Sequence, residues 1–110
     1  MDIKISDRKL RKAIKSERKL QREYGKMRAE KILERMEELE RANTLEDLRI
    51  GPGNYHELTD DRKGQWACNL DQPYRMIFIP QEDPIPTDEH GRYIWIEIEG
   101  VEITEITDYH

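Results

Sequence analysis

The pattern of apolar positions predicts one strand and a helical hairpin in the N-terminal third of the chain. Residues 3–5 alternate apolar and polar, which is typical of a short strand. Apolar positions at helical spacing predict one helix over 7–24 and a second over 26–42, with a shared apolar seam. Thr44, followed three residues later by Asp47, is typical of a capping box for a short turn.

After Gly51-Pro52-Gly53 the pattern changes to strand. The segment 80–92 contains three prolines, which a central strand does not accommodate, so it is predicted to be a loop. This order predicts a single α+β domain over residues 1–110, in which the helical hairpin packs on one face of a twisted, mostly antiparallel sheet. The predicted strands are 56–58, 65–70, 74–79, 93–98 and 101–106.

Cysteine content and hydropathy indicate the compartment. Cys68 is the single cysteine, so no internal disulfide can form and a reducing environment is expected. The N-terminal segment has no long apolar run, and no segment approaches the ~20 apolar residues that a membrane span requires. We therefore expect a cytoplasmic protein without a membrane partner.

Charge is distributed very unevenly along the chain, whose formal net charge is -5. Residues 1–28 carry eleven Lys or Arg against four Asp or Glu, whereas residues 76–110 carry only Arg92 against nine acidic residues. A basic helical surface of this kind can dock on phosphates, although a merely solvated helix is an equal alternative. The lysines that we take as docking candidates are Lys9, Lys12 and Lys19.

Reactive side chains gather in the C-terminal half of the chain. Beyond residue 50 there are four Lys or Arg residues, and Arg62, Lys63 and Arg75 lie in one part of the predicted sheet. Metal-free RNA cleavage needs a base for the 2′-hydroxyl, cations for the phosphorane and an acid for the leaving 5′-oxygen. His56 and the terminal 108–110 segment supply suitable groups. A half-buried histidine, an ion-paired arginine and a frayed chain end are the plainer interpretations.

We expect no metal and no cofactor. Asp88, His90 and His110 do not follow the spacing of a zinc site, and a single cysteine adds little to such a site. Trp66 and Trp95 are expected in the core or on a sheet face, where large aromatic residues usually lie, rather than stacked on bases.

Four segments taken together resemble the HigB branch of the RelE/ParE toxin superfamily, and the similarity runs from end to end. They combine a His-x-Leu strand, an Asp-Arg-Lys-Gly-Gln turn, a Tyr-Arg strand and a terminal Asp-Tyr-His. The loop 83–86 is similar to that of a long-loop subgroup. The segments are Gly51 to Leu58, Asp61 to Trp66, Pro73 to Phe78 and Glu105 to His110.

The resemblance implies an mRNA interferase that enters the ribosomal A site and cuts the codon there. It implies a cognate helix-turn-helix antitoxin of the HigA type, and it makes the lysines above candidates for ribosome docking. Two departures are that Thr59 and Asp60 stand where relatives often carry Lys and Gly, and that the chain is acidic. The implied catalytic residues are His56, Asp108, Tyr109 and His110, and the implied phosphate-binding residues are Arg62, Lys63 and Arg75.

Two other functions stay open at this point. A ParE-type toxin inhibits DNA gyrase by protein contact and cleaves nothing. An inactive toxin fold would serve only as a partner of its antitoxin. His56 together with the terminal 108–110 segment favours the nuclease, because a gyrase-binding protein does not need paired proton-transfer groups.

Overall fold

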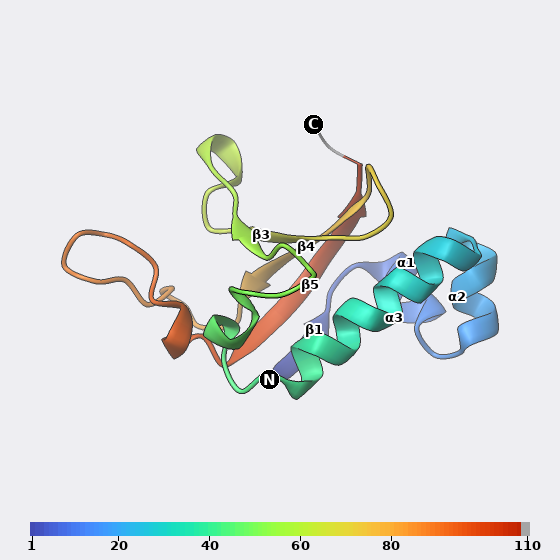
Figure 1. Ribbon diagram of the computed structural model, residues 1–110, viewed down its shortest axis with the longest axis horizontal. Coiled ribbons are helices and arrows are strands. Elements are labelled where there is room, and N and C mark those ends of the chain that lie inside the picture. The colour runs from blue at the N-terminus through green and yellow to red at the C-terminus, as the bar shows by residue number, and fades with distance from the viewer. Residues whose placement is uncertain (109–110) are drawn as a thin grey trace.

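The computed structural model describes residues 1–108, in which three α-helices pack beside a five-stranded sheet (Figure 1). The helices follow the first strand directly, and the other four strands come after them. The strands are β1 (Asp2–Ile5), β2 (His56–Glu57), β3 (Trp66–Asn69), β4 (Arg75–Pro80) and β5 (Gly100–Thr107). The helices are α1 (Arg8–Ala13), α2 (Glu17–Tyr24) and α3 (Lys26–Arg41), with 3-10 turns η1 (Leu45–Leu48), η2 (Asp60–Arg62) and η3 (Trp95–Glu97).

The sheet is mostly antiparallel, as the sequence predicts. Its strand order is β1-β5-β4-β3-β2, and only β1, which pairs with β5, runs parallel to its neighbour among the described strands. β2 is a short edge strand, so its side chains lie at the rim of the sheet. Among residues 1–108, no helix has the length and apolar character needed to cross a membrane.

The two faces of the sheet have different environments. Trp66, Cys68, Met76 and Phe78 belong to the main core, together with buried helix residues such as Leu20. A small second cluster of Leu58, Ala67 and Ile77 lies apart from this core. Successive strand residues point to opposite faces, so the main core lies on the face that the helices cover and the second cluster lies on the other face. We call this other face, which the helices do not cover, the open face. This arrangement confirms the predicted packing of helices on one face.

The predicted helix over 7–24 is wrong in one respect, because the chain forms two helices there. α1 ends at Ala13 and α2 begins at Glu17. Ser16 has an extended backbone, and its side chain accepts a hydrogen bond from the Lys19 amide at 3.1 Å. This N-cap starts a new helix and stabilises the break.

The predicted strand over 93–98 is also wrong, because this segment forms η3 and only an isolated bridge between Thr87 and Tyr93. The Trp95 indole N–H donates to a Glu57 carboxylate oxygen at 2.7 Å, and its ring packs edge-on against Trp66. Both tryptophans are buried, as expected. The need to satisfy a buried indole N–H favours this turn over a strand.

The seam of α3 differs from the apolar pattern at two positions. Leu33 is 37% exposed, whereas Arg35 is 5% exposed. The Arg35 guanidinium donates to the Asn69 carbonyl and to a Glu38 carboxylate oxygen, each at 2.7 Å. A buried charge is tolerated where it is paired and hydrogen-bonded, which apolar periodicity alone does not reveal.

Candidate active site

Cross-strand register places the main candidates on the open face of the sheet. His56 pairs with Ala67, Ala67 with Ile77, and Ile77 with Glu105. Residues directly opposite one another in antiparallel strands share a face, so this row runs across four strands. Arg75, two residues before Ile77 on β4, lies on the same face.

The His56 ring is oriented by a hydrogen bond to the backbone. Its Nδ1 lies 2.7 Å from the carbonyl oxygen of Asn54. A carbonyl oxygen only accepts, so Nδ1 carries the proton and donates it to this bond. In the neutral ring, Nε2 is then the lone-pair nitrogen and is able to accept a proton. His56 and Arg62 both line a hollow of about 470 Å³ at the rim of the sheet.

Arg62 lies in the segment between β2 and β3, and its side chain reaches β5. Its Nη1 donates to Gln65 Oε1 at 2.9 Å and to Glu105 Oε1 at 3.1 Å. The two side chains of the ion pair are 28% and 41% exposed, respectively, so the pair remains accessible to an incoming phosphate.

Arg75 is oriented by a neighbouring amide. Its Nη1 donates to Asn69 Oδ1 at 2.7 Å, and the Cα atoms of the two residues are paired across β3 and β4. An arginine side chain has five N–H donors, so this bond fixes its orientation while leaving donors for a planar anion.

Of the remaining candidates, Lys63 and Asp108 lie within the described residues 1–108. Lys63 is exposed directly after η2, and within residues 1–108 its side chain forms no ion pair. Asp108 is exposed and follows Thr107, whose pairing partner is Arg75. The candidates Tyr109 and His110 lie outside the described residues.

Carboxylates dominate the immediate surroundings of His56. Glu57, Asp60 and Asp61 line its hollow, against the single cation of Arg62. Asp60 has a φ of 56°, in the left-handed region that glycine adopts most readily. This negative charge would repel an anionic ligand, so binding of such a ligand at the hollow would depend on the nearby cations.

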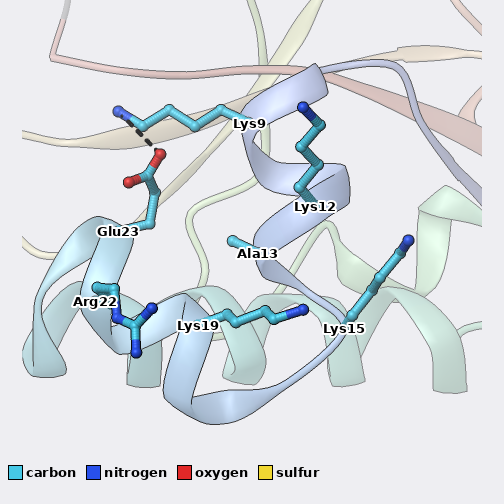
Figure 2. A pocket seen from close by; sticks show the side chains of 7 residues that line it. All are labelled: Lys9, Lys12, Ala13, Lys15, Lys19, Arg22 and Glu23. Carbon is cyan, nitrogen blue, oxygen red and sulfur yellow. Dashed lines mark ion pairs between the residues drawn. The ribbon is translucent and has the colours of Figure 1, made fainter.

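A separate hollow, lined mainly by cations, lies between α1 and α2, and we call it the basic cleft (Figure 2). It is a hollow of about 360 Å³ and contains all three lysines that the sequence singled out. Glu23 is the one acidic residue in its lining and pairs with Lys9 at 3.9 Å. The cleft is lined by Lys9, Lys12, Ala13, Lys15, Lys19, Arg22 and Glu23.

Sequence reasoning missed Asn69 and Glu105, which orient the two arginines. The sequence of 101–106 shows the alternation of a strand, but the strand register, which decides which residues of β4 lie opposite Glu105, cannot be deduced from it. Among residues 1–108, no group of three His, Cys, Asp or Glu side chains is arranged to hold a metal ion.

The fold has solved counterparts. No protein-family model matches this sequence, and no curated protein matches it significantly. The chain is similar to a YoeB/ParE toxin from Agrobacterium tumefaciens, with 12% identity, full coverage of both chains and a TM-score of 0.60. It is also similar to the YoeB-YefM complex and the YoeB dimer from Staphylococcus aureus, with 16% and 14% identity and TM-scores of 0.55 and 0.56. These two matches cover all of this chain and 97% of the other. This chain therefore has the α+β fold of the YoeB/ParE toxins, as the sequence predicts.

Proposed function

We propose that this protein is the toxin of a toxin–antitoxin pair and acts as a ribosome-dependent mRNA endoribonuclease of the HigB type. The observation that carries the proposal is that His56, whose Nδ1 is hydrogen-bonded to a backbone carbonyl, shares a sheet face with Arg75, and that Arg62 reaches the same face through Glu105. A proton acceptor and two guanidinium groups on one face of a sheet suit attack on a phosphodiester.

In the proposed reaction His56 Nε2 accepts the proton of a 2′-hydroxyl. The 2′-oxygen then attacks the adjacent phosphorus, and the bond from phosphorus to the 5′-oxygen breaks. Arg62, Lys63 and Arg75 stabilise the negative charge of the phosphorane. The leaving 5′-oxygen takes its proton from the chain end, where we assign His110 as the acid and Asp108 and Tyr109 as supporting groups. The products are a 2′,3′-cyclic phosphate and a free 5′-hydroxyl.

Dependence on the ribosome follows from electrostatics. The carboxylates that line the hollow of His56 repel free RNA. Docking of Lys9, Lys12 and Lys19 on ribosomal RNA would bring the mRNA to the site in spite of this repulsion. The partner that we propose for neutralisation is a HigA-like helix-turn-helix antitoxin. The likeness to the YoeB-YefM complex supports an antitoxin partner in general.

The proposed catalytic role of His56 is tested by cleavage of mRNA on translating ribosomes. His56→Ala should lower the cleavage rate by about 10²–10⁴-fold. His90→Ala is the matched control, because His90 is exposed in the 80–92 loop, where its Nε2 lies 3.4 Å from Oε1 of the neighbouring Glu89. Full toxicity of the His56→Ala variant would contradict the nuclease and favour inhibition of another target by protein contact.

The assignment of the acid is tested separately by deleting His110 alone. We expect growth arrest on expression to be lost while the thermal melting temperature stays unchanged. A deletion variant as toxic as the parent, beside a harmless His56→Ala variant, would remove His110 from the mechanism.

A further inference from the structure

Among the described residues, most cations of the basic cleft have no carboxylate partner. Lys9 is the exception, because it pairs with Glu23 and its Nζ lies 5.5 Å from the centre of the Tyr24 ring. Within residues 1–108, the other four cationic side chains form neither an ion pair nor a hydrogen bond. These four, which we call the free cations, are Lys12, Lys15, Lys19 and Arg22.

Most cations of α3 do have a carboxylate partner, Lys26 being the exception among the described residues. Lys31 pairs with Glu34 at 3.3 Å, and Arg41 pairs with Glu37 at 2.6 Å, each within one helical turn. On α1 and α2 several cations instead lie three or four residues from another cation, as Lys9 does from Lys12 and Lys19 from Arg22, and such like-charged pairs destabilise a helix. An anion bound in the cleft would neutralise this charge.

The break between α1 and α2 gives the free cations their shape. Positions 12, 15, 19 and 22 would form a single stripe along a continuous helix. Because Ser16 caps a new helix, the stripe is folded into a hollow, with Lys12 on the α1 wall, Lys19 and Arg22 on the α2 wall, and Lys15 between them (Figure 2). An extended anion in the cleft would contact both walls.

We infer that the free cations form a binding site for the phosphodiester backbone of RNA. The inference deepens the proposed function and relies on it for the identity of the anion, which is ribosomal RNA. It also separates Lys9 from the docking lysines, because Glu23 already offsets its charge, and it adds Lys15 and Arg22. Each phosphate contact releases counterions, so binding should weaken steeply as salt rises.

The test is binding of the purified protein to a labelled RNA hairpin, followed by fluorescence anisotropy over a series of salt concentrations. The variant Lys15→Gln/Arg22→Gln removes two free cations. Arg18→Gln/Lys26→Gln is the matched control, because it removes the same two residue types from exposed positions outside the cleft. No cleavage is measured, so the result does not depend on the active site.

We expect the slope of log K against log salt to fall by about 2 in the cleft variant and to stay near the native value in the control. Lys9→Gln should change the slope less than Lys15→Gln does. Equal losses in the cleft variant and the control would overturn the site. Binding of poly-glutamate as tightly as the hairpin would also overturn it, because the cleft would then fit an acidic protein segment.

Discussion

Arg62 and Glu105, 43 residues apart in the chain, are joined by a hydrogen-bonded ion pair of 3.1 Å. The pair holds the guanidinium over the open face of the sheet. Glu105→Gln should lower kcat for ribosomal mRNA cleavage by roughly tenfold to a hundredfold, because small displacements of a positioning group are costly. Since the pair is partly exposed, the free energy of unfolding should change by less than about 1 kcal/mol.

Glu102→Gln provides the control for this prediction, because it removes the same charge from the same strand, three residues away. It should leave kcat near the native value. An unchanged kcat in Glu105→Gln would show that Arg62 needs no such support.

Asp60 has a left-handed backbone, with a φ of 56°. Asp60→Gly and Asp60→Ala remove the same charge but differ in backbone freedom. The glycine variant should be more stable by about 1 kcal/mol, because alanine is strained in this region. At Thr59, with a φ of -123°, the alanine variant should instead match or exceed the glycine variant. Urea unfolding of the four variants measures both differences, and the same order at both positions would contradict this account.

Burial raises the pKa of the Cys68 thiol to about 12. At pH 8 the buried thiol is therefore protonated, and thiolate is the reactive form. The native protein should therefore leave Ellman's reagent unreacted over minutes at pH 8 and react with one equivalent after unfolding in guanidinium. Rapid reaction of the folded protein would show that β3 opens readily.

Arg35 links α3 to β3 through the Asn69 carbonyl and pairs with Glu38, which also accepts a hydrogen bond from Tyr55. Arg35→Ala should lower the free energy of unfolding by about 3 kcal/mol, because it leaves a buried network unpaired. Arg41→Ala breaks an exposed pair on the same helix and should cost less than about 1 kcal/mol. Urea denaturation separates the two, and similar losses would argue against a structural role for Arg35.

The sequence predicts the order of most elements because their periodicity is local. It does not predict the contact between Arg62 and Glu105, because that contact depends on register. β4 and β5 shift register between Ile77 and Phe78, and a slip of one residue would turn Glu105 to the helical face. The break at Ser16 had a local signal, a good N-cap residue, but the surrounding polar residues also suit a continuous helix. Tertiary packing of Trp95 likewise outweighs the strand pattern of 93–98.

We propose that this protein cleaves mRNA only on the ribosome. The most direct measurement compares the cleavage rate of one mRNA by the purified protein with and without translating ribosomes, with primer extension locating the cuts. We predict cuts within codons on ribosomes, 5′-hydroxyl ends on the downstream fragments, and largely intact naked mRNA under the same conditions. Equal rates with and without ribosomes would contradict ribosome dependence, and intact mRNA in both would contradict the nuclease itself.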